Sequence, residues 1–161
     1  ASVANPFPVS IQAAGGYSAS ATFTPAATSH VTPDIIGGAQ SFALGAPSGA
    51  TLRIVSASLL VASATNETAT WRLYLYSVTP PSALADDATF DLPAGDLASF
   101  LGYFDFAQLV DLGSALFIEA TPNKIMTLTG TGVFGYLVNL TTLTPAAVAH
   151  TVKLNTVPVA Y

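Results

Sequence analysis

The clearest secondary-structure signal in the chain is ATWRLYLYSVT, at positions 69–79. Trp71, Leu73 and Leu75 fall on one side of an extended chain, because successive side chains of a strand point to opposite faces. Arginine, two tyrosines and a valine alternate with them on the other side. This period of two predicts a β-strand that lays one face on a hydrophobic core. Pro80 and Pro81 end the strand, since proline has no N–H to donate.

Further strands are expected on both sides of this one, because turn residues punctuate the chain at short intervals. The strongest turn signals are Gly37-Gly38, GAPSG at 45–49 and Gly130-Thr131-Gly132. Strand patterns cover residues 31–36, 39–44, 51–64, 101–106, 115–120, 124–129, 133–141 and 151–157. One helical turn is expected at residues 96–100, capped by Asp96. Many short strands and almost no helix predict an all-β fold, an antiparallel β-sandwich or jelly roll.

The first 29 residues differ from the rest. They hold three prolines, a Gly-Gly pair and no formal charge, and their large residues follow no helical spacing. We therefore expect an extended N-terminal arm over residues 1–29, with an edge strand as one option at 17–24, and a β-sandwich domain over residues 30–161. Such an arm is ordered by lying on its own domain or on a neighbouring subunit. Its expected contact residues are Phe7, Val9, Ile11, Tyr17 and Phe23.

The composition is unusual in its charge content. Charged residues make up 8% of the chain, against about 25% in a typical soluble domain. A free monomer normally keeps a mixed, charged surface, and this chain has too few ions to build one. Its surface is expected to consist of Ala, Ser and Thr, which desolvate cheaply because no ion has to leave water. This indicates a protein that is covered by other subunits; a Thr-rich β-protein with a bland surface is the alternative.

Several classes of partner fit the sequence poorly. The net charge is −5, and Arg53, Arg72, Lys124 and Lys153 are scattered singly, so no cluster exists to neutralise the phosphates of nucleic acid. A long uncharged stretch, residues 125–152, is interrupted by glycines and a proline, which indicates strands and not a membrane-spanning helix. The N-terminus shows no secretory signal. There is no cysteine, so disulfides and thiolate metal sites are excluded.

Ionisable groups form no recognisable catalytic or metal motif. His30 and His150 lie far apart in the chain without a nucleophile motif, so both are expected to be surface or strand-end residues. Four aspartates are the best candidates for a cation such as Ca²⁺, which takes six to eight oxygen ligands. Their spacing matches no calcium loop, and aspartate is also a favoured turn residue, so a structural role is expected and no metal or cofactor is assigned. These residues are Asp86, Asp87, Asp91 and Asp96.

The sequence does not indicate a site for carbohydrate chemistry either. Glu67 and Glu119 are the two glutamates, and nothing in the sequence pairs them as the two acids of a glycosidase. The aromatic residues of 71–76 form either a sugar-stacking strip or part of the core, and core is the usual place for aromatic area. The triplets at 66–68 and 139–141 match the N-glycosylation pattern, which means little without a secretory route. We therefore predict that the chain is not an enzyme.

The order of motifs from residue 30 to residue 161 resembles the head decoration (cement) proteins of tailed bacteriophages. The resemblance rests on VTPDIIGG at 31–38, WRLYLY at 71–76 before Pro81-Ser82, DDATFDL at 86–92 and GYLV at 135–138. It implies a jelly-roll-like sandwich that clamps neighbouring copies of the major capsid protein from outside. It also implies assembly as a homodimer or homotrimer, synthesis in the host cytoplasm and a place on the virion head. The N-terminal arm has no counterpart in the resemblance.

The sequence thus predicts a structural virion protein that stabilises the head by bridging capsid subunits. If the arm makes the contact, deletion of residues 1–28 should leave a folded protein that binds heads poorly. The alternative is a phage tail, baseplate or fibre module that binds a host surface or a glycan. A secreted carbohydrate-active enzyme or binding module is a third hypothesis, which requires a signal peptide and affinity for sugar.

Overall fold

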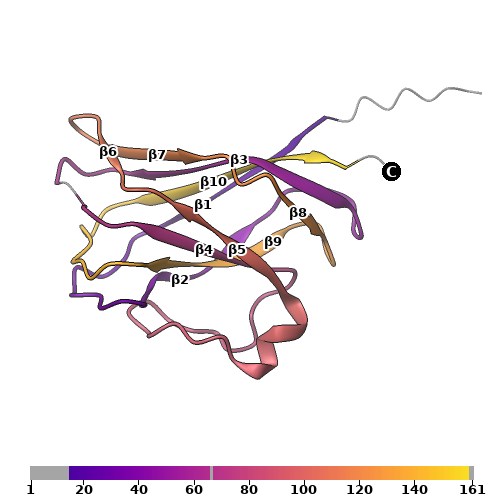
Figure 1. The fold of residues 1–161 in the computed structure, drawn as a ribbon, viewed down its shortest axis with the longest axis horizontal. Helices are drawn as coiled ribbons and strands as arrows, with labels where there is room; N and C mark the ends of the chain where they lie inside the picture. The colour runs from indigo at the N-terminus through magenta and orange to yellow at the C-terminus, as the bar shows by residue number, and fades with distance from the viewer. Residues whose placement is uncertain (1–14, 66, 160–161) are drawn as a thin grey trace, which may run out of the picture.

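The computed structural model describes residues 15–65 and 67–159 and consists of two antiparallel sheets packed face to face (Figure 1). The six-stranded sheet contains, in spatial order, β1 (Tyr17–Phe23), β10 (His150–Pro158), β3 (Thr51–Val61), β7 (Leu116–Ala120) and β6 (Val110–Asp111), with β8 (Lys124–Thr127) also pairing with β3. The four-stranded sheet contains β2 (Ile35–Phe42), β9 (Val133–Asn139), β4 (Trp71–Tyr76) and β5 (Phe100–Phe106). A 3₁₀ helix, η1 (Ala94–Ser99), precedes β5. The predicted antiparallel β-sandwich is confirmed.

The strand pairing is nested, as in a single long hairpin that has been rolled up. The first strand pairs with the last (β1 with β10) and the second with the second-last (β2 with β9). Further in, β3 pairs with β7 and β8, and β4 pairs with β5. Strands β1 to β4 alternate between the two sheets, and their later partners follow them into the same sheets, which gives a jelly-roll topology in which the two sheets cover each other's inner faces.

The core follows from the alternation in β4. Trp71, Leu73 and Leu75 are fully buried, and they pack against side chains of the opposite sheet such as Leu52 and Leu59 of β3. Burying one side chain of this size stabilises the fold by about 1.5–3 kcal/mol. The three buried side chains of β4 together therefore stabilise it by several kcal/mol. The core interpretation of the aromatic strip is confirmed, since Trp71 and Tyr76 expose no surface.

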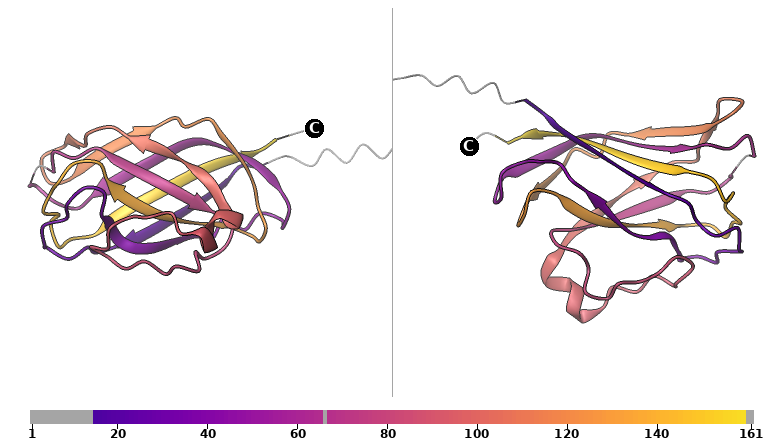
Figure 2. Two further views of the ribbon diagram at one scale, coloured as in Figure 1. Left: turned by 60° about the horizontal axis from the view of Figure 1, so that its bottom comes forward. Right: turned by 180° about the vertical axis from the view of Figure 1, so that it is seen from behind.

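The outer side of the four-stranded sheet is also covered. Residues 77–99 cross it as a long segment that includes η1, below the sheet in Figure 1 and in front of it in Figure 2 (left). A second apolar cluster lies between sheet and segment, where the ring centroids of Tyr74 and Phe90 are 3.9 Å apart. The covering segment explains why the tyrosines of β4, on the face opposite Trp71, are also packed. No equivalent segment among the described residues covers the six-stranded sheet.

Two details of the predicted secondary structure are wrong. Gly37 and Gly38 were expected to form a turn, but β2 runs through them and the pairing with β9 shifts between Ile36 and Ala39. Both glycines have positive φ, +78° and +74°, so they form a bulge within the strand. Asp96 does not cap the helical turn either, because Pro93 occupies the N-cap position and Asp96 is buried inside η1.

Part of the segment expected as an N-terminal arm, residues 1–29, pairs with the sandwich. Strand β1 pairs with β10 along its whole length, so it is an integral edge strand of the six-stranded sheet, as the edge-strand option predicted. Tyr17 and Phe23 are half-buried and pack against the core of their own domain. The other expected contact residues, Phe7, Val9 and Ile11, lie outside the described residues.

Candidate functional site

The outer face of the six-stranded sheet is not covered by another segment of the described chain (Figure 1). By alternation it comprises Ser18, Ser20, Thr22, Arg53, Val55, Ser56, Ser58, Leu60, Val110, Phe117, Glu119, Ile125, Thr127, Thr151, Lys153, Asn155 and Val157. The molecule exposes ten large apolar side chains among the described residues, and five of them lie on the strands of this sheet. These five are Val55, Leu60, Val110, Ile125 and Val157.

The outer face is ordered in rows that run across the strands. One row follows the register from Val110 through Phe117, Leu60 and Thr151 to Thr22, and the last two hydroxyls are 2.9 Å apart. This row carries apolar side chains at its β6 and β7 end and small hydroxyls toward β1. The next row runs from Glu119 through Ser58 and Lys153 to Ser20 and carries two opposite charges.

Most side chains on this face are uncharged. Of the thirteen charged residues in the chain, its described members are Arg53, Glu119 and Lys153. Three carboxylates elsewhere, those of Asp34, Glu67 and Asp96, are buried, which lowers the charge of the surface further than the composition alone implies. A face of hydroxyl and apolar groups costs little to desolvate, so it is suited to burial against another protein.

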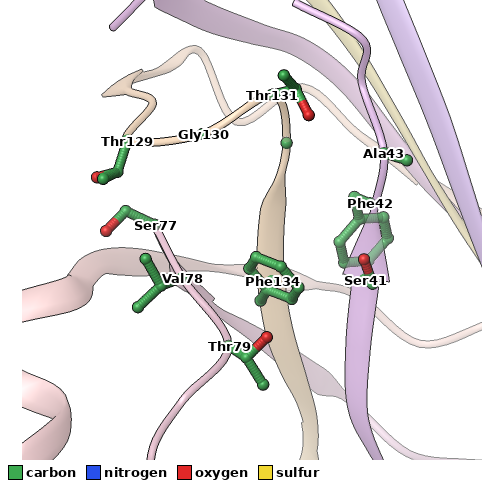
Figure 3. Close-up of a pocket in the computed structure, with 11 residues that line it drawn as sticks. Ser41, Phe42, Ala43, Ser77, Val78, Thr79, Thr129, Gly130, Thr131 and Phe134 are labelled. Atoms are coloured by element: carbon green, nitrogen blue, oxygen red, sulfur yellow. The ribbon is translucent and has the colours of Figure 1, made fainter. Parts of the chain in front are cut away.

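A groove of about 430 Å³ opens at one end of the four-stranded sheet. Its walls come from the end of β2, the residues after β4, and the turn between β8 and β9; Figure 3 shows Phe134 between Ser41 and Val78. Five side chains of its lining carry hydroxyls, and none of the eleven lining residues is charged. The groove therefore offers an aromatic ring and hydrogen-bonding groups, but no acid or base for catalysis.

His150, expected at a surface or strand end, begins β10 but is fully buried. Its Nδ1 lies 3.0 Å from the carbonyl oxygen of Val148, and its Nε2 lies 3.2 Å from a carboxylate oxygen of Glu67. The other carboxylate oxygen of Glu67 accepts the backbone N–H of Ala146 at 2.9 Å. The imidazole also stacks on Phe23 of β1, with ring centroids 5.8 Å apart. The pair thus ties the β3–β4 loop to the β9–β10 connection.

His30, in the β1–β2 connection, repeats this arrangement with a different carboxylate. Its Nδ1 lies 3.0 Å from the carbonyl oxygen of Thr28, and its Nε2 lies 3.1 Å from the Asp86 carboxylate. The same carboxylate accepts the backbone N–H groups of Ala26 and Gly37, each at 2.7 Å. Through these hydrogen bonds Asp86 connects the covering segment, residues 77–99, to the β1–β2 connection and to β2.

The charges of this second pair stabilise each other. Burial opposes protonation of the imidazole, but the carbonyl of Thr28 and the carboxylates of Asp86 and Asp87 outweigh it and raise the pKa of His30. Burial also disfavours the charged carboxylate, yet two backbone N–H groups and the imidazole lower the pKa of Asp86. In both histidines each ring nitrogen already faces a protein acceptor, so neither ring has a nitrogen left for a substrate. Both histidines therefore have structural roles and hold loops of the sandwich together.

The four aspartates that were considered for a cation are dispersed. Asp86 and Asp87 lie near His30, whereas Asp96 accepts hydrogen bonds from the backbone N–H and hydroxyl of Ser82. Asp91 is exposed. Within residues 15–65 and 67–159, no group of three or more His, Cys, Asp or Glu side chains is placed to hold a metal ion. The structure thus gives Asp86 and Asp96 hydrogen-bonding roles within the fold.

The remaining sequence candidates are also located. Glu67 is buried beside His150 and Glu119 is exposed on β7, so they share no site. Asn139, part of one glycosylation triplet, is fully buried, and its amide donates to the carbonyl oxygens of His30 and Thr141. Sequence reasoning missed both His–carboxylate pairs, because their members lie 56 and 83 positions apart. No helix in the described part of the chain is long and apolar enough to cross a membrane.

Comparison with known proteins adds little to these observations. No protein-family model matches the chain. No curated protein matches its sequence. Among solved structures, one chain of the crystal structure of an Israel acute paralysis virus pentamer is similar over 91% of this chain and 88% of that chain, with 14% sequence identity and a TM-score of 0.31. A similarity this weak carries no argument about function.

Proposed function

We propose that the protein is a structural, non-enzymatic component of a virion, which decorates a bacteriophage head and stabilises it by binding the major capsid protein. The observation that carries this proposal is the outer face of the six-stranded sheet, which is uncovered and consists mostly of hydroxyl and apolar side chains. The order of sequence motifs that resembles phage decoration proteins supports the same function.

The energetics of the outer face favour burial against protein. Exposed apolar side chains gain roughly 25 cal/mol for each Å² removed from water, while Ser and Thr lose little because they carry no ion. A standard protein–protein contact buries about 1,600 Å² in total, and the face of a six-stranded sheet is a suitable size for one side of it. A decoration protein adds many such contacts per particle, so modest affinity at each site suffices.

Residues 1–14 are proposed as a second contact with the shell. Phe7, Val9 and Ile11 are the large apolar residues of this segment, and the segment carries no charge. This revised arm begins before β1 and excludes Tyr17 and Phe23, which belong to the core. We assign it to the head surface together with the outer face.

Location and copy number on the particle test this function. Antibody labelling of intact particles, combined with quantitative mass spectrometry of purified virions, should place the protein on the head in many copies. Label confined to the tail, with a few copies per particle, would contradict the decoration role.

The groove beside Phe134 is the observation that favours the alternative, a tail module that binds a host glycan. An aromatic ring surrounded by hydroxyls is a common way to bind a sugar. Under this alternative, a glycan array should give a ligand whose binding is lost when Thr79 or Thr131, which line the groove, is replaced by Trp. Under the decoration function, no glycan binds and these substitutions leave head binding unchanged.

A further inference from the structure

Strand β1 forms one edge of the six-stranded sheet and is unusually open. Its sequence, YSASATF, contains no charge and no proline, and its pairing with β10 continues without a bulge from Tyr17 to Phe23 (Figure 2, right). The backbone hydrogen bonds of the described residues include none between the free side of β1 and any other segment. Long, flat and uncharged edges of this kind are templates for pairing with another strand.

The hydrogen-bond ladder shows which backbone groups are free. The bond from Ala62 N–H to the Ala149 carbonyl makes His150 and Val61 a non-hydrogen-bonded pair in β10 and β3. By alternation His150, and every second residue after it, directs its N–H and C=O toward β1. Their partners are Tyr17, Ala19, Ala21 and Phe23, so the N–H and C=O groups of Ser18, Ser20 and Thr22 point away from the sheet.

Three other edge strands, β2, β5 and β6, are protected. Along β2, residues 87–90 cover the edge through bonds such as Ile35 N–H to the Ala88 carbonyl, and the Gly37-Gly38 bulge interrupts it. The edge strand β5 has a register shift opposite Leu75, beside Gly102 with φ of +97°. Strand β6 is two residues long. Natural sheets use such bulges, covers and short strands to prevent edge pairing, and β1 has none of them.

We propose that β1 pairs antiparallel with β1 of a second copy of this chain, about a two-fold axis at Ser20. In this register Ser20 faces Ser20 of the other copy, and Ser18 faces Thr22. The three outward-pointing residues would exchange both backbone bonds with their partners, which leaves no free donor or acceptor along the strand. The two six-stranded sheets become one continuous sheet, and the outer face doubles in area.

The second copy is the occupant that the strand itself favours. The free N–H and C=O groups of β1 are arranged symmetrically about Ser20. Two antiparallel copies of the strand can therefore hydrogen-bond to each other, as an isologous two-fold interface requires. Ala19 and Ala21 face each other across the axis, and these small side chains allow the two strands to approach. The strand carries no charge that would repel its copy. This pairing goes beyond the decoration function, because it concerns the purified protein without any shell.

Single cysteines test the register directly, because the chain contains none. Hydrogen-bonded antiparallel residues have Cα atoms about 5.5 Å apart, within the range of a disulfide. Ser20→Cys should therefore form a disulfide-linked dimer under mild oxidation. Ser18→Cys and Thr22→Cys should each remain monomeric on a non-reducing gel when oxidised alone and cross-link when mixed. Thr127→Cys, exposed on the outer face but distant from β1, is the control for random collision.

A proline substitution tests the pairing independently. Ser20→Pro removes an N–H that points away from β10, so the protein should keep its fold but sediment as a monomer. Ser20→Thr keeps the N–H and should sediment as a dimer, like the unmodified protein. Circular dichroism and a melting curve establish that both variants fold. A monomeric unmodified protein, a dimer that survives Ser20→Pro, or cross-linking of Ser20→Cys no faster than Thr127→Cys would each overturn the proposal.

The result is separable from the function proposed above. If a folded Ser20→Pro monomer still binds head shells, the decoration function stands and the pairing is not needed for it. If the protein forms the β1-paired dimer but binds no shell, the pairing stands and the decoration function fails.

Discussion

At the scale of single residues, two buried His–carboxylate pairs hold the loops of the sandwich. His150 and Glu67 join the β3–β4 loop to the chain before β10, and His30 and Asp86 join the covering segment to β2. The chain has thirteen charged residues, and several of them are buried. This indicates that the buried ones have a structural role. Breaking a buried pair by removing one partner leaves the other uncompensated, which costs about 3–5 kcal/mol.

Replacement of Glu67 tests this role against a matched control. Glu67→Ala leaves the imidazole of His150 and the N–H of Ala146 without their acceptor, so the free energy of unfolding should fall by about 3 kcal/mol. Glu119→Ala removes the other glutamate, which is exposed, and should change stability by less than about 0.5 kcal/mol. Urea denaturation of both variants measures the difference. Equal effects would show that the buried pair contributes nothing.

The His30–Asp86 pair predicts a dependence of stability on pH. Because the folded protein raises the pKa of His30, its contribution is complete below about pH 6.5 and is lost as pH rises through the folded pKa. Because the fold lowers the pKa of Asp86, its contribution is present above about pH 4 and is lost as pH falls through the folded value. The two contributions coincide between about pH 4 and 6.5.

Urea titrations at about pH 5.5 and pH 8.5, on either side of the ordinary histidine pKa, measure this effect. The unmodified protein should lose stability at the higher pH. His30→Gln, which cannot be protonated, should lose less between the same two values. A loss of equal size in both proteins would contradict the assignment to His30.

These residue roles were largely beyond the reach of the sequence. The alternation of β4 correctly placed Trp71, Leu73 and Leu75 in the core, since a period of two is a local property. The partners of His30 and His150 come from distant loops, and no local pattern reports which loops meet. The buried position of Asp96 was missed for the same reason, because Ser82 reaches it across the covering segment.

At the scale of elements, the bulge in β2 decides how the strand fits its neighbours. Gly37 and Gly38 both have positive φ, and the ring of Phe23 from β1 occupies the space where a side chain of Gly37 would lie. The glycine pair was recognised in the sequence as special but interpreted as a turn. A two-glycine turn and a two-glycine bulge require the same backbone freedom, and pairing with β9 decides between them.

Alanine substitutions should separate the two glycines. Gly38→Ala introduces backbone strain alone, since its new methyl group would meet nothing closer than 3.7 Å, and should cost about 1–3 kcal/mol. Gly37→Ala adds a methyl group 2.1 Å from a ring carbon of Phe23, and overpacking adds about another 1–3 kcal/mol. Denaturation of both variants measures the order. If Gly37→Ala is the milder change, the contact with Phe23 is not rigid.

Strand β1 also revises the expected effect of truncation. Deletion of residues 1–28 removes the whole strand, which takes Ala21 and Phe23 from the core and exposes the edge of β10. This deletion should lower the melting temperature strongly or prevent folding. Deletion of residues 1–14 should preserve the melting temperature, because every described core contact comes from residue 17 onward. A stable protein without residues 1–28 would show that β1 contributes little.

At the scale of the whole molecule, low charge content and jelly-roll topology lead to one interpretation. The sequence predicted a surface poor in ions, and it could not show where the uncovered surface lies. That depends on residues 77–99, which cover the four-stranded sheet and leave the outer face of the six-stranded sheet open. The protein is thus a sandwich with one face packed by its own chain and the other available to partners.

Binding to head shells assembled from the major capsid protein alone tests this interpretation best. The purified protein should saturate a fixed number of sites per shell. Ile125→Lys and Leu60→Lys place a charge in the outer face and should weaken binding at least about tenfold, since an unpaired buried charge costs more than the 1.4 kcal/mol of one decade. Leu97→Lys, on η1 and as exposed as Ile125, is the matched control and should bind normally. Absence of binding, or equal binding by all three variants, would contradict the role of the outer face.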